Sequence, residues 1–186
     1  FFNSIEKALQ QEITDIFGEG GPNKIDFDGI GEIKLPFFSM GQINTTHLFG
    51  IDELIIFAFY LANKRNYNKV ADIGANIGLH SIILRKLGYQ VSSFEPDPRH
   101  CAQFSENMEA NLINDGFALN QVAVSNKVGD IDFTRVTGNT TGSHITGAKG
   151  AYGDLEKFSV SCVPFNEILR QHDLVKADVE GHEAVL

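Results

Sequence analysis

Short apolar segments alternate with longer helical segments along residues 69–179. This alternation is typical of parallel strands that are joined by right-handed helical crossovers. Asp97 followed by Pro98 indicates a helix start, with a capping residue and then proline at the first helical position. We therefore expect an α/β fold with a doubly wound, mostly parallel sheet. The expected strands are 69–73, 90–94, 118–124 and 174–179, and the expected helices are 77–87 and 98–112.

The apolar pattern in the first third of the chain predicts an accessory layer of helices and a hairpin. Apolar residues at helical spacing run from Phe2 to Phe17, and residues 24–35 alternate as in a short hairpin. Residues 51–64 predict a buried helix, with Asp52 and Glu53 in its first turn, where the helix dipole favours negative charge. We expect an N-terminal accessory segment of residues 1–67 that packs on a core of residues 68–186.

An insertion is predicted between the third and fourth core strands. Residues 129–135 and 157–163 have the pattern of two strands, and they flank a loop rich in Gly, Thr and Ser at residues 137–153. The loop suggests a substrate lid around His144. Because glycine-rich loops are common and usually only mobile, a merely flexible connection is the alternative.

A glycine turn follows the first core strand. Gly74 and Gly78 lack a Cβ, so the backbone there can turn tightly and approach a ligand. Glu95 lies 21 residues after Gly74 and ends the next strand, close to the spacing at which a carboxylate binds ribose hydroxyls. Asn76 replaces the second glycine of the dinucleotide fingerprint, and Asp72 adds negative charge. The turn therefore favours a nucleoside with an ammonium or amide group over a pyrophosphate.

Three motifs in order resemble the FkbM-type family of S-adenosylmethionine-dependent methyltransferases. They are Val70–Gly78 (VADIGANIG), Phe94–Pro98 (FEPDP) and Lys176–Glu183 (KADVEGHE), and Ala123–Asn126 followed by Gly129 is a weaker fourth match. The resemblance covers about two thirds of the chain, residues 68–186. It implies the Rossmann-like class I fold, whose sheet has seven strands. Because this chain ends just after the fourth, we expect the C-terminal strands to be missing and the chain to be a fragment.

The resemblance also implies where S-adenosylmethionine lies. The turn from Gly74 through Ala75 and Asn76 to Gly78 would hold the methionine part, while Asp72 sets the turn or contacts the ammonium group. Glu95 would bind the ribose hydroxyls through charge-assisted hydrogen bonds. The residues expected to border the adenine are Pro96 and either Gln121 or Val122, and a structural role for Gln121 is the alternative.

Asp178 and Glu180 are the candidates for the transfer site. Two residues apart on a strand they would share a face, where one could remove a proton from the acceptor or both could bind a divalent cation such as Mg²⁺. Alternatively, Asp178 fixes the strand end or the cofactor, and Glu180 caps a following helix. His80 and His182 are further candidate bases. No His/Cys pattern of the zinc type is present, so metal dependence stays open.

The composition and charge of the chain limit the kinds of partner that it can bind. The net charge of −9 and the lack of a long basic run disfavour nucleic acid and anionic membranes. The longest apolar run, residues 54–62, is too short to span a bilayer. Cys101 and Cys162 have no metal or disulfide spacing and are expected to be core thiols. We expect a cytoplasmic enzyme.

The expected function is O-methylation of a hydroxyl on a small-molecule or sugar-like acceptor, an acceptor class that the resemblance alone implies. Two alternatives stay open. One is a binding or scaffold protein that keeps the nucleoside pocket without catalysis. The other is an NAD-dependent oxidoreductase, which Asn76 disfavours because it stands where a glycine would approach the pyrophosphate.

Overall fold

A parallel sheet forms the centre of the computed structural model, which describes residues 2–148, 150 and 153–186. Its strands are hydrogen-bonded in the order β10-β3-β4-β5. β3, the first of them in the chain, therefore lies between β4 and β10, and the topology reverses direction at the boundary between β3 and β10. The bounds are β3 Lys69–Ile73, β4 Gln90–Phe94, β5 Phe117–Asn120 and β10 Leu174–Ala177.

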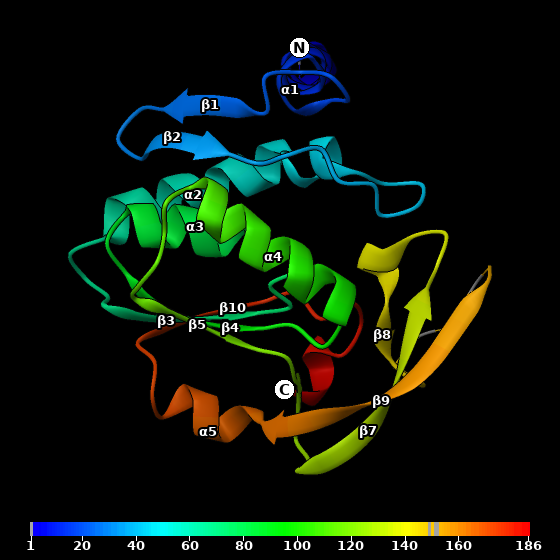
Figure 1. The fold of residues 1–186 in the computed structure, drawn as a ribbon. Helices are drawn as coiled ribbons and strands as arrows, with labels where there is room; N and C mark the ends of the chain where they lie inside the picture. The colour runs from blue at the N-terminus through cyan, green and yellow to red at the C-terminus, as the bar shows by residue number, and fades with distance from the viewer. Residues whose placement is uncertain (1, 149, 151–152) are drawn as a thin grey trace.

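Helices cover both faces of this sheet, as Figure 1 shows. On one face lie α2 (Ile51–Asn63), α3 (Leu79–Lys86) and α4 (Pro98–Ala110), and on the other lies α5 (Phe165–Leu169). The four residues of β3 that follow Lys69 are all buried, as expected for a strand that is covered on both sides. The doubly wound α/β fold predicted from the sequence is confirmed.

The N-terminal segment packs on the outside of this helical layer. It contains α1 (Phe2–Phe17), the antiparallel hairpin of β1 (Lys24–Phe27) and β2 (Gly31–Lys34), and the 3-10 helix η1 (Thr45–Leu48). Phe17 stacks on Phe49 with ring centroids 4.4 Å apart. Buried residues of this segment belong to the same apolar cluster as residues of β3 and α3. The expected helix and hairpin are both present.

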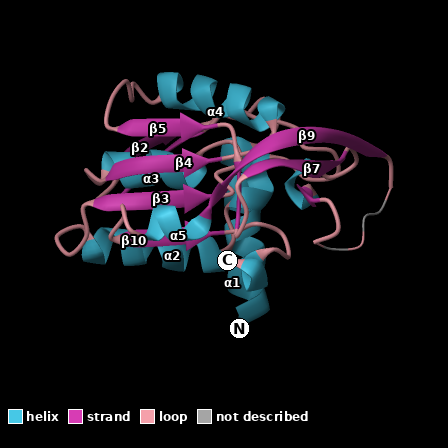
Figure 2. Ribbon diagram, turned by 90° about the horizontal axis from the view of Figure 1, so that it is seen from below, coloured by secondary structure: helices cyan, strands magenta, loops and turns pink. Residues whose placement is uncertain are grey.

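A second, mixed sheet lies beyond the carboxyl ends of the parallel strands, on the side toward which β3, β4 and β5 point (Figure 2). Its order is β6-β9-β7-β8, and β7 pairs antiparallel with β9. The two insertion strands predicted from the sequence are present and somewhat longer than predicted. The bounds are β6 Ala123–Ser125, β7 Gly129–Val136, η2 Thr140–Gly142, β8 His144–Ile145 and β9 Leu155–Pro164.

The expected third core strand, residues 118–124, is wrong as a single element. The chain leaves the parallel sheet after Asn120, where the amide of Val122 donates to the carbonyl of Asn120 over 2.9 Å. This bond takes the place of a ladder bond, and the exposed Gln121 lies in the turn. Residues from Ala123 onward then pair with β9 in the second sheet.

The ends of two other elements also differ from prediction. β10 ends at Ala177, so Asp178 and Glu180 lie in the following loop and do not share a strand face. Glu180 has a left-handed φ of 52°, which also departs from strand geometry. α3 begins at Leu79 instead of residue 77, because Gly78 before it is left-handed with φ 90°.

Candidate active site

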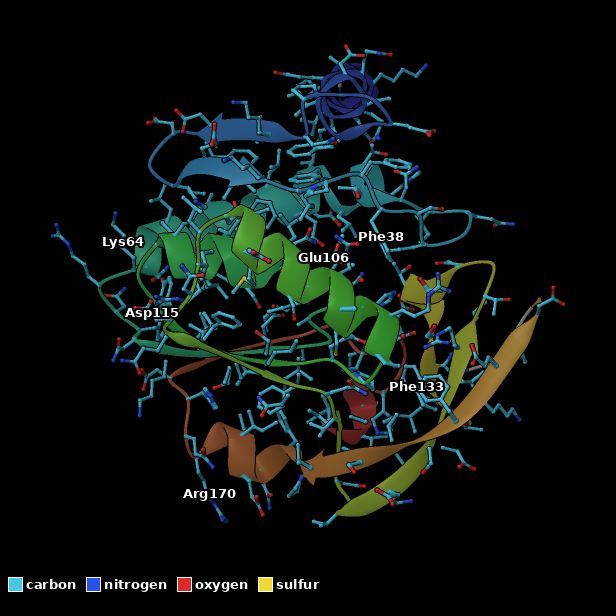
Figure 3. The ribbon with its side chains drawn as sticks, viewed as in Figure 1. Phe38, Lys64, Glu106, Asp115, Phe133 and Arg170 are labelled. Atoms are coloured by element: carbon cyan, nitrogen blue, oxygen red, sulfur yellow. The ribbon has the colours of Figure 1, made fainter. Side chains whose placement is uncertain are left out.

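A cavity of about 250 Å³ opens at the carboxyl ends of the parallel strands. Ligands of open α/β sheets bind at this edge, beside the point where the strand order reverses. The turn after β3, the end of β4 and the loop after β10 line the cavity on the side of the sheet. The N-terminal segment contributes Ile43, His47, Leu48 and Glu53 to its lining. The second sheet and the residues around η2 contribute Phe133, Thr140, Thr141, Ser143, His144 and Ile145. Phe133, one of these lining residues, is labelled in Figure 3.

Gly74 and Asp178 meet at the boundary between β3 and β10. The amide of Asp178 donates to the carbonyl of Ile73 over 3.0 Å, which holds the two strand ends together. Gly74 has φ 72°, and a Cβ built on it would lie 1.8 Å from the carbonyl oxygen of Asp178. A side chain at this position would overlap the backbone of the neighbouring loop. Gly74 therefore allows both loops to line one cavity.

Three backbone amides of the turn donate hydrogen bonds to other groups of the protein. Those of Gly74 and Ala75 donate to the carbonyl of Phe94 over 2.9 and 3.1 Å. That of Asn76 donates to Oε2 of Glu95 over 2.9 Å. Phosphate sites of this kind depend on backbone N–H groups that point at the ligand. These three amides are not available to an anion, which disfavours a pyrophosphate at this part of the turn.

Glu95 links the turn to the end of β4. Its side chain is buried, and in addition to the Asn76 amide it accepts the amide of Asp97 at Oε1 over 2.9 Å. Nδ1 of His100 lies 3.7 Å from the same oxygen. An ionised carboxylate has about four lone-pair sites, so two backbone bonds leave acceptor capacity on Glu95. Because Glu95 also lines the cavity, this capacity is available to hydroxyl groups of a ligand.

Asp72 is fully buried behind the cavity and does not line it. One of its oxygens lies 3.3 Å from Nζ of Lys176, and the other accepts the hydroxyl of Ser81 over 2.7 Å. Burial alone would raise the pKa of Asp72, but the Lys176 charge outweighs it and lowers that pKa. Nζ of Lys176 also donates to the carbonyl of Gly74 over 3.2 Å. The pair therefore sets the shape of the turn.

Asp178 and Glu180 both line the cavity from the loop after β10. Burial raises the pKa of Asp178, and the nearby carboxylates of Glu180 and Glu53 raise it further, whereas Lys176 lowers it. A carboxylate with a raised pKa is better suited to accept a proton than an ordinary one. The arrangement can thus remove a proton from a ligand at this edge of the sheet.

The family profile described as Methyltransferase FkbM domain matches residues 72–185, more than half of the chain. This chain belongs to the FkbM methyltransferase family. The match covers all the motifs on which the resemblance was based except the first two residues of the first one, and it confirms that resemblance.

Among solved structures, the chain has a likeness to the SAM-dependent methyltransferase from Agrobacterium tumefaciens. The likeness has a TM-score of 0.42 at 12% sequence identity, and it covers 53% of this chain. The chain spans about a third of that protein's length, since 31% of it is covered. No curated protein matches this chain in sequence.

The structure of this FkbM-family chain brings most of the predicted site residues to one cavity. Gly74, Ala75, Asn76, Glu95, Pro96, Asp178 and Glu180 all line it. Oδ1 of Asn76 is buried and has no donor among the described residues. His80, one of the candidate bases, also lines the cavity.

Besides the buried Asp72, four of the predicted residues lie outside the cavity. Gly78 packs on α4, where a Cβ would lie 2.7 Å from the ring of Phe104. Gln121 is exposed, and Val122 packs with the apolar cluster of α5, so neither lines the cavity. His182 also lies outside the cavity, 2.9 Å from the hydroxyl of Ser125. Ala123 and Val124, which follow the turn, line the cavity instead.

The second sheet is fastened to the end of β4 by a buried ion pair. Nε and Nη2 of Arg135 on β7 donate to the carboxylate of Asp97 over 2.6 and 2.7 Å. Asp97 also caps α4 as expected, because it accepts the amide of Arg99. Burial would raise the pKa of Asp97, but the hydrogen bonds from Arg135 lower it below its usual value. No pattern in the sequence indicates this pair, since its members are 38 residues apart.

The loop that was predicted as a lid reaches the cavity in part. The buried His144 and Thr140 line the cavity, and the hydroxyl of Thr140 lies 2.9 Å from Nε2 of His100. The amide of Thr140 donates to the carbonyl of Met40, so the N-terminal segment and the insertion meet beside the cavity. Residues 149 and 151–152 of the predicted lid lie outside the described residues.

Cys101 and Cys162 are free and buried, as expected. Within the described residues, no three His, Cys, Asp or Glu side chains are grouped so that they could hold a metal ion. The cation role considered for Asp178 and Glu180 therefore gains no support from the geometry. None of the described helices combines the length and the apolar character that crossing a bilayer requires.

Proposed function

We propose that the chain binds S-adenosylmethionine in this cavity and methylates a hydroxyl group of a small-molecule or sugar-like acceptor. The observation that carries the proposal is that the amides of Gly74, Ala75 and Asn76 donate to Phe94 and Glu95, so these three are not free to bind a phosphate. Among the described lining residues, Lys176 is the only lysine or arginine, and it pairs with Asp72. The other charged lining residues are the carboxylates Glu53, Glu95, Asp178 and Glu180, and this excess of negative charge suits a cationic ligand.

The described residues fit the parts of this cofactor in order along the sheet edge. Glu95, after β4, would accept the ribose hydroxyls, and Pro96 would border the adenine. Gly74, Ala75 and Asn76, after the neighbouring β3, would hold the methionine part. Adjacent strands are about 5 Å apart, so a nucleoside with its ribose at β4 directs its amino-acid arm across β3 toward β10.

Asp178 would act at the reacting end of the cavity. The cofactor supplies a methyl group on a positively charged sulfur, which needs no further activation. The chain must then orient the acceptor hydroxyl and take up its proton. Asp178 is suited to the second task, because it lines the cavity and has a raised pKa. Glu180 would assist from the same loop.

The acceptor class is supported by the side of the cavity that faces the second sheet. Thr141, Ser143 and His144 supply groups that hydrogen-bond, and Phe133 supplies an apolar ring. Hydroxyls of a sugar-like molecule can pair with the first three, while its carbon face can pack on the ring. Residues 1–67 would serve as an accessory segment that closes the opposite side.

Calorimetry with S-adenosylhomocysteine and with NAD tests the cofactor. We expect S-adenosylhomocysteine to bind at least about a hundredfold more tightly, because the amides of Gly74, Ala75 and Asn76 are not free for a pyrophosphate. Tighter binding of NAD would overturn the proposal. Transfer of a labelled methyl group to a panel of polyols and sugars then separates an enzyme from a binding protein, since a scaffold would bind the cofactor without turnover.

A further inference from the structure

A single histidine on α3 is held by one face of α2. Glu53, Phe57 and Tyr60 are spaced by four and three residues, which places them on the same side of the helix. Oε2 of Glu53 lies 2.9 Å from Nε2 of His80, and the hydroxyl of Tyr60 lies 3.1 Å from Nδ1. The ring of Phe57 packs edge-on against the imidazole with centroids 5.3 Å apart. Both ring nitrogens of His80 therefore have partners.

Of these side chains, the Glu53 carboxylate is the group best placed to contact a ligand. Glu53 and His80 both line the cavity, and the side chain of Glu53 keeps 28% of its surface exposed, against 12% for His80. Because His80 is engaged through both nitrogens, it is placed to orient Glu53 and not to take a proton from the acceptor. Tyr60 stays a neutral hydroxyl, since burial and the charges of Asp72 and Glu53 raise its pKa.

Glu53 lies at the end of the cavity where β3 and β10 meet. Its carboxylate is close enough to Lys176 and Asp72 to interact with their charges, and it also acts on Asp178. Glu95 marks the other end, after β4. Under the proposed function, the ribose lies at Glu95 and the amino-acid arm of the cofactor reaches the end where Glu53 is placed.

We propose that Glu53, oriented by His80, binds the ammonium group of the methionine part of the cofactor. This inference rests on the proposed function. Asp72 cannot make that contact, because it is fully buried and pairs with Lys176 and Ser81. Glu53 lies upstream of residues 72–185, the part that matches the family profile, so the accessory segment contributes a residue to the cofactor site.

The two carboxylates at this end of the cavity have different environments. The close contact with His80 lowers the pKa of Glu53, whereas burial raises that of Asp178. Two carboxylates whose pKa values are pushed apart are suited to separate roles. Glu53 stays ionised and can hold a cation, while Asp178 is the one that accepts a proton.

Paired ligands test the inference by calorimetry on the full chain. S-adenosylhomocysteine carries the ammonium group, and 5′-methylthioadenosine has the same nucleoside without the amino-acid arm. We expect Glu53→Gln to weaken binding of S-adenosylhomocysteine at least about tenfold through loss of a charge-assisted contact. Binding of 5′-methylthioadenosine should change less than about twofold. Asp52→Asn, which removes an exposed carboxylate from the same helix turn, should change neither affinity.

His80→Gln tests the positioning role with the same two ligands. It should weaken S-adenosylhomocysteine binding in the same selective way, but by less than Glu53→Gln, because the carboxylate remains. Equal losses for both ligands in Glu53→Gln would mean a purely structural role and would overturn the inference. Unchanged S-adenosylhomocysteine affinity with a raised KM for the acceptor would place Glu53 on the acceptor side and overturn it too. If the wild-type chain bound neither ligand, the proposed function itself would fail.

Discussion

The carbonyl oxygen of Asp178 lies where the side chain of residue 74 would project, 1.8 Å from the position of a Cβ on Gly74. The two residues directly follow β3 and β10, which are far apart in sequence and adjacent in the sheet, where Ala177 pairs with Ile73. This contact places the turn that would hold the cofactor beside the carboxylate that would accept the proton. The absence of one side chain thus controls the geometry of the site.

Gly74→Ala is therefore expected to lower the free energy of unfolding by roughly 3 kcal/mol, from backbone overlap and from the cost of a positive φ. Chemical denaturation measures this change. Gly20→Ala is the matched control, because Gly20 has φ 80° and nothing within 4 Å of its Cβ position. The control should cost only about 1 kcal/mol. Equal losses in the two variants would mean that the contact with Asp178 has no effect of its own.

Glu95→Gln should weaken S-adenosylhomocysteine binding by about tenfold or more. The variant keeps the size of the side chain but removes the charge that strengthens hydrogen bonds from ribose hydroxyls. Calorimetry measures the affinity, and the thermal midpoint shows whether the bonds to Asn76 and Asp97 survive. Glu106→Gln on α4 is an exposed control (Figure 3) and should leave the affinity unchanged. Wild-type affinity in a folded Glu95→Gln protein would remove Glu95 from the site.

Asp178→Asn should reduce methyl transfer by at least about 100-fold, because a general base contributes roughly 10²–10⁴-fold to rate. Cofactor affinity and the thermal midpoint should stay near those of the wild type. The pKa of Asp178 is raised above its ordinary 3.8, so wild-type turnover should fall as the pH drops through this raised value. A single-turnover assay at several pH values measures both effects.

Two results would contradict this role of Asp178. Full turnover by Asp178→Asn on the true acceptor would exclude Asp178 as the base. Loss of wild-type activity with EDTA would point to a metal ligand instead, since a carboxylate base needs no cation.

Asp97→Asn should lower the free energy of unfolding at pH 7 by about 3 kcal/mol, because Arg135 loses its buried partner and keeps only the exposed Glu156. The pKa of Asp97 in the folded protein is lowered, so the pair stabilises the protein above the unfolded pKa. That stabilisation is lost as the pH falls through the folded pKa. Denaturation of both proteins from pH 7 to pH 3 should therefore show that the free energy of unfolding falls less in the variant than in the wild type.

The exposed Asp26 supplies the control for this experiment. Asp26→Asn should change stability by less than about 0.5 kcal/mol and keep the wild-type pH dependence. If Asp97→Asn lost as much stability on acidification as the wild type, the Asp97–Arg135 pair would not be a source of acid sensitivity.

The sequence by itself determined the elements that local chemistry controls. Alternating apolar and helical segments indicated the doubly wound sheet, and Asp97 with Pro98 indicated the start of α4. The motifs around Gly74, Glu95 and Asp178 marked the strand ends that line the cavity. These features are readable because each depends on neighbours within a few residues or on a fixed spacing.

Only the tertiary structure decided which distant residues meet. Gln121 and Val122 were expected beside the adenine, but a tight turn after Asn120 moves the chain into the second sheet. Asp72 was considered for the ammonium group, but pairing with Lys176 buries it. Glu53 reaches His80 only because α2 packs on α3. Such pairings depend on how helices and strands pack across the fold, and no local pattern in the sequence records them.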